Sequence, residues 1–178
     1  DYRRLRALTE KKERFAVIGG GFIGSEITAA LALNRKKVVL IFPGKVICGR
    51  VFPEALSGFV TNFYKQKGVE VLAGEKVAAV ETQGSELVVR TGSGREIPVD
   101  GVVAGLGIEP NVGLAEMAKL EVENGIVVDE FLRTSNPNIY AAGDVAAFLN
   151  PSLGKRVRVE HVDNTNTMGR LAGRNMAV

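Results

Sequence analysis

A run of three glycines at the end of an apolar segment constrains the fold more than any other feature of the sequence. The stretch VIGGGFIGSE, residues 17–26, places Gly19, Gly21 and Gly24 in the spacing G-x-G-x-x-G. The residues before it are typical of a strand buried on both faces, and those after it are rich in helix formers. In that context the first glycine permits a tight turn, the second lets a pyrophosphate approach the backbone, and the third lets the helix pack closely on the strand. The helix N-terminus then favours an anion. The stretch therefore predicts a dinucleotide-binding turn, with a plain tight turn as the alternative.

Strand-like and helix-like segments alternate along the first part of the chain. Apolar runs at 37–42 and 69–74 indicate two further buried strands, and 53–68 is predicted to be a helix. Such alternation implies a parallel sheet with right-handed crossovers. From residue 75 apolar and polar residues alternate between the turns QGS and GSG, which predicts an antiparallel meander, and a buried strand returns at 100–107. We expect an α/β fold, with a Rossmann-like parallel sheet, helices on both of its faces and an antiparallel β-meander.

The two ends of the chain have weaker patterns. We expect a surface helix at 1–13 and a short helix at 111–119, two strands at 125–129 and 138–143, and a terminal helix at 163–178.

The composition excludes several classes of site. Cys48 is the only cysteine and His161 the only histidine of the 178 residues. A disulfide or a dithiol pair within the chain is therefore excluded, and we expect no metal site. Lys and Arg exceed Asp and Glu by only 23 to 20 and are scattered, so nucleic-acid binding has no support. We see no membrane span and no secretory signal, so we expect a cytoplasmic or mitochondrial or other organelle-interior location.

The choice between NAD and NADP depends on the residues after the second strand. NAD-binding turns of this kind have an acidic residue about 20 positions further on, which binds the adenosine ribose. Position 44 is glycine, and no Asp or Glu occurs between Glu26 and Glu54. Lys45 and Arg50 could instead bind a 2′-phosphate, which makes NADP at least as well supported as NAD. Alternatively, both are solvated loop charges.

Five stretches together resemble a known family. They are VIGGGFIGSE, IFPGKVICGRVFPEALS, GLGIEPNV, TSNPNIYAAGDVAAF and RVEHVDNTNTMGRLAGRNM, in this order. The chain resembles the flavin-dependent pyridine nucleotide-disulfide oxidoreductases, especially apoptosis-inducing factor, the ferredoxin reductases and the monodehydroascorbate reductases.

The resemblance implies a domain organisation. Residues 1–13 would form a connecting helix, 14–130 the NAD(P)H-binding Rossmann-type domain, and 131–178 a partial FAD-binding domain. The first FAD-binding turn and the family's C-terminal domain are missing, so we expect the chain to be a fragment of a longer enzyme.

The resemblance also implies roles for single residues. Glu26, Phe22, Glu160 and His161 would lie near the nicotinamide and the flavin, with Glu26 and His161 in catalytic roles. Structural alternatives stay open for each of these residues, and a plain turn would explain Gly107 equally well. Together with the turn and loop residues above, the candidate cofactor-binding set is Gly19, Gly20, Gly21, Phe22, Ile23, Gly24, Glu26, Pro43, Lys45, Arg50, Gly107, Gly143, Asp144, Glu160 and His161.

These features favour an NAD(P)H:acceptor flavoprotein oxidoreductase, in which hydride passes from NAD(P)H to FAD and on to an unidentified acceptor. The fragment alone would be inactive, and a dimer of the full-length protein stays open. A flavin-free short-chain dehydrogenase is disfavoured, because no tyrosine is followed by a lysine four positions later. The alternative function is redox signalling with slow or no turnover, as in apoptosis-inducing factor.

Overall fold

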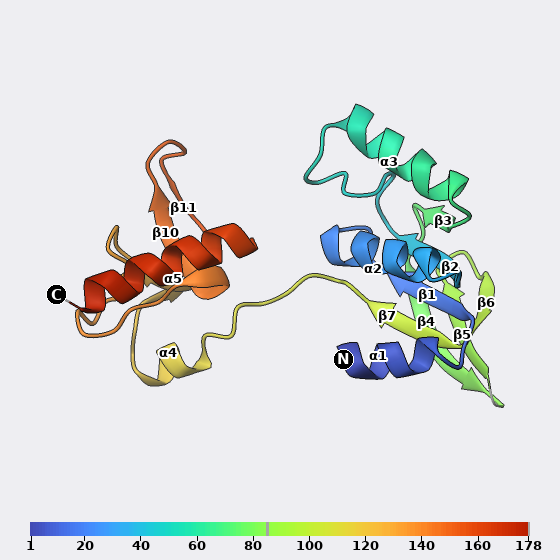
Figure 1. The fold of residues 1–178 in the computed structure, drawn as a ribbon, viewed down its shortest axis with the longest axis horizontal. Coiled ribbons are helices and arrows are strands. Elements are labelled where there is room, and N and C mark those ends of the chain that lie inside the picture. Colours follow the sequence, from blue (N-terminus) through green and yellow to red (C-terminus); the bar gives the residue numbers. More distant parts are fainter. Residues whose placement is uncertain (85, 178) are drawn as a thin grey trace. The chain divides into compact units, whose positions relative to one another are not determined.

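The computed structural model describes residues 1–84 and 86–177. The chain forms two compact units, Asp1–Gly107 and Ile108–Val178 (Figure 1). This division lies ahead of the boundary expected between residues 130 and 131, because residues 126–128 form a strand that pairs with residues 146–148. Ser85, in the expected QGS turn, lies outside the described residues.

The first unit contains a parallel sheet in the order β3-β2-β1-β7. Its strands are β1 (Arg14–Ile18), β2 (Lys37–Phe42), β3 (Glu70–Ala73) and β7 (Gly101–Ala104). All three neighbouring pairs are parallel, with Val17 opposite Leu40 on one side and Val103 on the other. Because β1 is central, the turn that follows it lies in the middle of the sheet's carboxyl edge.

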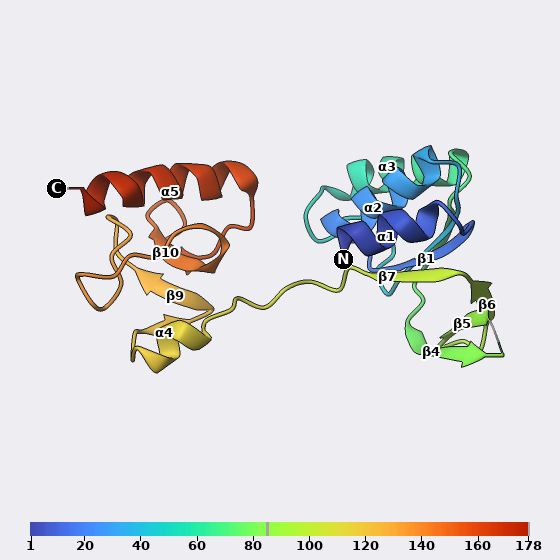
Figure 2. The same ribbon diagram turned by 60° about the horizontal axis from the view of Figure 1, so that its bottom comes forward.

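Helices cover one face of this sheet, which differs from the expected arrangement with helices on both faces. They are α1 (Tyr2–Thr9), α2 (Phe22–Leu33) and α3 (Glu54–Gln66). Side chains from all three pack on a core that includes Phe15, Val17 and Leu40. The opposite face packs against the antiparallel sheet of β4 (Val77–Gln83), β5 (Glu86–Thr91) and β6 (Glu96–Val99), through a second core around Ile41 and Val89 (Figure 2). The apolar side of the meander takes the place of helices on this face. The expected α/β class, with a parallel sheet and an antiparallel meander, is confirmed.

The second unit is built on a four-stranded mixed sheet in the order β11-β10-β9-β8. Its elements are α4 (Gly113–Met117), β8 (Val122–Glu123), β9 (Gly125–Val128), the 3-10 helix η1 (Gly143–Val145), β10 (Ala146–Asn150), β11 (Lys155–Val157) and α5 (Val162–Met176). Helix α5 contributes Met168 and Ala172 to a core shared with Val128 and Ala146.

The strand expected at 138–143 does not form. Its only β-bridge is the isolated one between Tyr140 and Arg133, and the extended backbone ends at the left-handed Gly143 (φ +82°). The strands that pair with β9 are β10 and β8.

No helix among the described residues is both long and apolar enough to cross a membrane.

Candidate functional site

The glycine turn lies at the carboxyl edge of the parallel sheet, and two of its glycines are required by close backbone contacts. Gly19 is left-handed (φ +115°), and a Cβ there would overlap the carbonyl oxygen of Gly105, which follows β7. A Cβ on Gly24, in the first turn of α2, would overlap the carbonyl oxygen of Gly19. Gly20 lies against the ring of Phe42, where a Cβ would be 2.6 Å from Cγ. These residues hold α2, β1 and β7 close together.

The N-terminus of α2 has the properties of an anion site. Gly21 is its N-cap and no side chain caps the helix. The N–H groups of Phe22, Ile23 and Gly24 donate to no acceptor among the described residues. Space beside Gly21 is open, since a Cβ there would meet no atom within 4 Å. Three unpartnered donors, the positive end of the helix dipole and an open approach together fit a phosphate or pyrophosphate.

The loop after β2, residues 43–52, is fixed to the glycine turn. The Cys48 N–H donates to the Gly20 carbonyl at 2.7 Å. The Phe52 ring contacts Phe22 edge-on, with 5.7 Å between centroids and 78° between planes. Lys45 and Arg50 are exposed on this loop and form no ion pair with a described residue. The structure thus brings a basic loop beside the helix N-terminus.

The remaining predicted residues of this unit are exposed around the same edge. Pro43 and Gly44 follow β2, and the Gly44 carbonyl accepts from the Gly74 N–H at 2.8 Å. Glu26 is exposed on α2, and Gly107 is exposed and left-handed (φ +103°).

Sequence reasoning missed two supporting residues. Gly105, rather than Gly107, is the residue of the GLG stretch against which Gly19 packs. The Tyr64 hydroxyl of α3 donates to the Ser25 carbonyl of α2 at 3.1 Å. Burial raises the pKa of this phenol, so it stays a hydrogen-bond donor at neutral pH. No sequence signal marks Tyr64, because its partner Ser25 lies 39 positions away in the chain.

The second unit brings together the other predicted residues. The Asp144 carboxylate accepts from the Thr165 hydroxyl of α5 at 2.9 Å. A Cβ on the left-handed Gly143 would lie 3.1 Å from Thr165 Cγ2. Gly143 and Asp144 are therefore held tightly against the start of α5, with the Asp144 side chain exposed.

Glu160 and His161 both have structural partners. Glu160 pairs with Arg158 at 2.7 Å, and Arg158 also donates to the Asp144 carbonyl at 2.8 Å. His161 is the N-cap of α5, where its Nδ1 accepts from the Asp163 N–H at 3.2 Å. Both side chains are exposed, so each is also accessible to a ligand.

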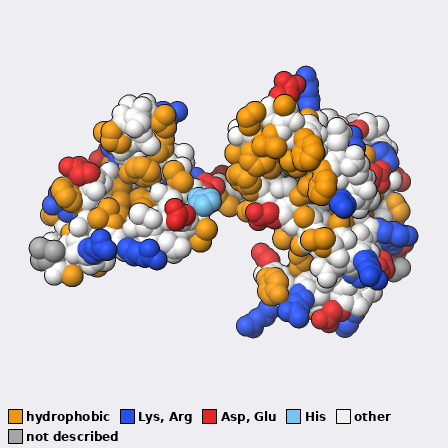
Figure 3. Space-filling view, turned by 45° about the horizontal axis from the view of Figure 1, so that its top comes forward, with side chains coloured by type: hydrophobic (Ala, Val, Ile, Leu, Met, Phe, Trp, Pro, Cys, Tyr) orange, Lys and Arg blue, Asp and Glu red, His pale blue; other side chains and the backbone are white. Residues whose placement is uncertain are grey.

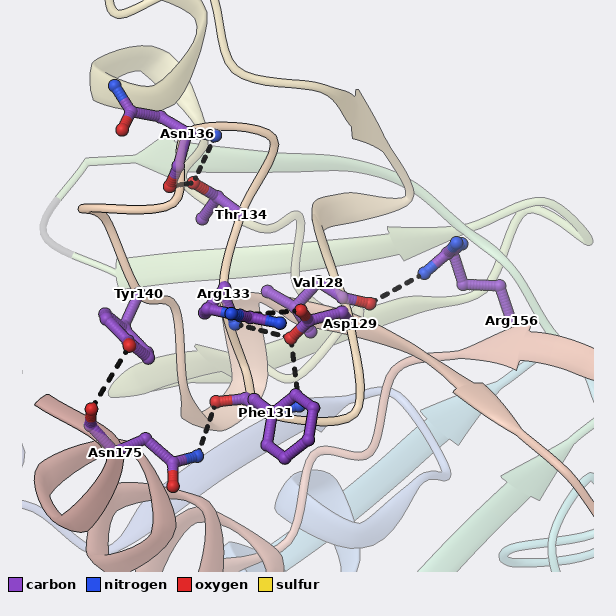
Figure 4. Close-up of polar contacts among 9 residues, drawn as sticks. All are labelled: Val128, Asp129, Phe131, Arg133, Thr134, Asn136, Tyr140, Arg156 and Asn175. Atoms are coloured by element: carbon purple, nitrogen blue, oxygen red, sulfur yellow. Dashed lines mark hydrogen bonds and ion pairs between the residues drawn. The ribbon is translucent and has the colours of Figure 1, made fainter. Parts of the chain in front are cut away.

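A polar network at the far end of α5 fixes the loop after β9 (Figure 4). Asp129 accepts from the N–H groups of Phe131 and Arg133, both at 2.9 Å, and pairs with the Arg133 side chain at 2.8 Å. Burial alone would raise the pKa of the Asp129 carboxyl, but these hydrogen bonds outweigh it and the pKa lies below its ordinary value. The side-chain amide of Asn175, on α5, donates to the Phe131 carbonyl at 2.8 Å, and the Asn175 backbone carbonyl accepts from the Tyr140 hydroxyl. The network is structural, because its charges are paired within it.

No group of three or more His, Cys, Asp or Glu side chains suited to a metal ion occurs within residues 1–84 and 86–177.

Known proteins match almost the whole chain. The ferredoxin--NAD(+) reductase component of the anthranilate 1,2-dioxygenase system of Burkholderia cepacia is 38% identical over 161 residues, which are 90% of this chain and 39% of that protein. Monodehydroascorbate reductase of Solanum lycopersicum is 37% identical over 164 residues, 90% of this chain and 38% of that protein. The crystal structure of the ferredoxin reductase for the CYP199A2 system from Rhodopseudomonas palustris superposes with a TM-score of 0.91 and 32% identity, covering 98% of this chain and 44% of that one.

The chain thus spans about two fifths of the length of the curated relatives it matches. The sequence profile described as "Pyridine nucleotide-disulphide oxidoreductase" matches residues 1–169. The resemblance predicted from the glycine turn and four further motifs is confirmed, and the chain belongs to the pyridine nucleotide-disulphide oxidoreductase family.

Proposed function

We propose that this chain is the NAD(P)H-binding portion, with part of the FAD-binding portion, of a flavoprotein oxidoreductase. The observation that carries the proposal is the N-terminus of α2, where three backbone N–H groups lack partners among the described residues beside the open face of Gly21. A pyrophosphate supplies the acceptors for these donors. The matched ferredoxin--NAD(+) reductase component is named for a nicotinamide nucleotide, which supports the same assignment.

The adenosine half of the nucleotide would lie along residues 43–50. This loop follows the strand next to β1 and is bonded to Gly20, so it lies beside the phosphate site. Lys45 and Arg50 are the charged side chains of that loop. With no carboxylate there to bind both ribose hydroxyls, the loop suits NADPH at least as well as NADH.

The nicotinamide half would extend past Phe22 and Glu26. Both side chains are exposed in the first two turns of α2, close to its uncapped N-terminus. Phe22 is held edge-on by Phe52, so its ring can limit where the nicotinamide lies. The Glu26 carboxylate can accept a hydrogen bond from the carboxamide or hold a proton near it.

The residues of the second unit fit one part of a flavin site. The 3-10 helix η1 begins at Gly143, and the carboxylate of the next residue, Asp144, is exposed. Hydrogen bonds from Thr165 to this carboxylate and from Arg158 to the Asp144 carbonyl hold the residue in place. Such a carboxylate can accept hydrogen bonds from ribityl hydroxyls. When bound, the flavin supplies the hydride chemistry, and the protein supplies binding and orientation. Glu160 and His161 would border the same site.

The acceptor that we propose for the whole protein is a small iron–sulfur protein of the ferredoxin kind. The names of the matched reductases from Burkholderia cepacia and Rhodopseudomonas palustris support this choice. The matched reductase of Solanum lycopersicum is named for monodehydroascorbate, so a small-molecule oxidant is the alternative.

Titration of the chain with NADH and with NADPH, followed by nucleotide fluorescence, tests the proposal. We expect saturable binding and at least a three-fold loss of NADPH affinity in Lys45→Ala and in Arg50→Ala. Lys12→Ala, an exposed lysine of the same unit away from the loop, is the matched control and should change neither affinity. Responses that do not saturate with either nucleotide would contradict the proposed site.

A further inference from the structure

Helix α3 exposes three large apolar side chains, although Val60 and Tyr64 of the same helix pack on the core. Leu56, Phe59 and Phe63 follow one another at the spacing i, i+3 and i+7, and their side chains are 45%, 67% and 45% exposed. Ser57 and Thr61 of the same helix are buried. A surface helix normally buries its apolar stripe and exposes polar residues. The α3 stripe, defined as Leu56, Phe59 and Phe63, therefore has the pattern of a binding face.

A groove of about 260 Å³ lies beside the α3 stripe, between α2 and α3. Ala29 and Ala32 of α2 line it with small side chains, and Phe63 and Tyr64 line it from α3. Leu33, at the end of α2, belongs to the same lining and is 84% exposed. Figure 3 shows apolar side chains gathered over this unit. A concave apolar groove next to an exposed stripe can accept the anchor side chains of a helix.

One basic side chain, Lys67, lines the groove, and three more basic residues lie close to its lining residues in the sequence. Arg35 and Lys37 follow Leu33 in the sequence, and Lys65 and Lys67 lie at the end of α3. None of the four forms an ion pair with a described residue. The Lys67 ammonium lies 5.3 Å from the centroid of the Phe63 ring, at the boundary between the charged and the apolar parts. A two-fold contact with a second copy would bring these like charges together, whereas an acidic partner would pair with them.

We propose that the α3 stripe and its groove bind an acidic amphipathic helix of a partner protein. Apolar side chains of that helix would fill the groove and cover Phe59, and its carboxylates would pair with the flanking lysines and arginines. A concave groove favours this occupant over a lipid surface, which takes up protruding apolar side chains. The docking surface shares no residue with the glycine turn or with residues 43–52, so the proposal is independent of nucleotide binding.

The test uses a fluorescent designed peptide of about 18 residues, or five helical turns, with Leu at the anchor positions i, i+3, i+4 and i+7 and Glu at the flanking positions. Its binding to the chain is followed by fluorescence anisotropy. We expect saturable binding that weakens at least ten-fold in Leu33→Ser and in Phe59→Ser. The double reversal Lys65→Glu, Lys67→Glu should weaken this peptide and strengthen a matched peptide with Lys in place of Glu. Leu114→Ser, on α4 and also 84% exposed, is the matched control and should leave binding unchanged.

Three results of the peptide and self-association measurements would overturn the proposal. The first is that the acidic and the basic peptide bind equally well. The second is that Leu33→Ser and Phe59→Ser leave peptide binding unchanged. The third is that the chain self-associates at the concentration used for peptide binding and that Leu33→Ser abolishes this self-association. Vesicles of phosphatidylglycerol test the lipid alternative. The proposal would also be overturned if the chain bound these vesicles, lost that binding in Phe59→Ser, and bound neither peptide. NADH and NADPH titrations of every variant should match those of the unaltered chain, which separates a local effect from misfolding.

Discussion

At the scale of single residues, Gly21 and Gly24 differ in what they can tolerate. A methyl group at Gly24 would overlap the Gly19 carbonyl, whereas one at Gly21 would enter open space. Gly24→Ala should therefore lower the free energy of unfolding by about 3 kcal/mol or more. Gly21→Ala should leave it within about 1 kcal/mol.

Nucleotide binding should separate the two variants further. In Gly21→Ala the new methyl group would lie in the approach of the proposed pyrophosphate, so affinity for NADH and NADPH should fall at least ten-fold although the fold is intact. Urea denaturation followed by circular dichroism gives the stability, and fluorescence titration gives the affinity. Unchanged affinity in Gly21→Ala would remove the pyrophosphate from this position.

Gly44 allows a test of cofactor choice at one residue. Its surroundings accept a side chain, because a Cβ there would lie 3.6 Å from Phe42 Cδ2, an ordinary contact. In Gly44→Asp the carboxylate can bind ribose hydroxyls and repels a 2′-phosphate. The ratio of NADPH to NADH affinity should fall at least ten-fold. Gly44→Asn, with similar size and no charge, is the control and should change this ratio much less.

At the scale of elements, Asp100 joins the start of β1 to the start of β7. Its carboxylate accepts from the backbone N–H groups of Arg14 and Glu13 at 2.8 and 3.2 Å and from the Arg14 guanidinium at 3.0 Å. Hydrogen bonds from Arg14 hold the pKa of the Asp100 carboxyl well below its ordinary value. A carboxyl whose pKa is lowered by folding stabilises the fold above its unfolded pKa of about 4, and this contribution is lost as the pH falls towards the folded pKa.

Asp100→Asn should therefore be less stable than the unaltered chain by about 2 kcal/mol at pH 7, and the difference should shrink between about pH 5 and pH 2. Urea denaturation at a series of pH values measures it. A difference that stays constant with pH would show that the charge of Asp100 is not what stabilises this junction.

The elements also show how much of the secondary structure can be predicted from the sequence. Buried parallel strands such as 37–42 are continuous apolar runs, and the observed β2 has the predicted ends. The same reasoning misassigned 138–143, because IYAA looks like a strand while only Tyr140 is bridged. It also left out β10, although its sequence AAFLN is largely apolar, and β11, whose sequence KRV is too short and too polar to suggest a strand. Which face the meander would cover depends on packing between distant segments, which local periodicity does not contain.

For a related reason, the sequence predicts some contacts of the candidate site and not others. Glycine spacing identifies the turn, because the conformation at Gly19 and the contact at Gly24 are local requirements. The contact between Gly19 and Gly105 joins residues 86 positions apart, and the sequence alone does not show it. The α3 stripe was likewise hidden, because only the structure shows which side of the helix is buried.

At the scale of the whole molecule, the two units have separate cores. The clusters around Phe15 and Val89 belong to the first unit, and the cluster around Met168 belongs to the second. A core substitution in the second unit should therefore leave nucleotide binding by the first unit intact. Met168→Ala removes a buried side chain that packs on β9 and β10, which should cost the second unit about 2–4 kcal/mol.

Hydrogen exchange followed by mass spectrometry on the complete chain resolves the two units. In Met168→Ala, exchange should accelerate in β9, β10 and α5 while β1 and β2 keep their protection. NADPH at about 100 times its Kd should add about 2.7 kcal/mol of protection to the first unit in both proteins, because a ligand stabilises only the unit that binds it. Loss of nucleotide affinity in Met168→Ala, or nucleotide protection that extends equally through α5, would mean that the units are thermodynamically coupled and that the site extends beyond residues 1–107.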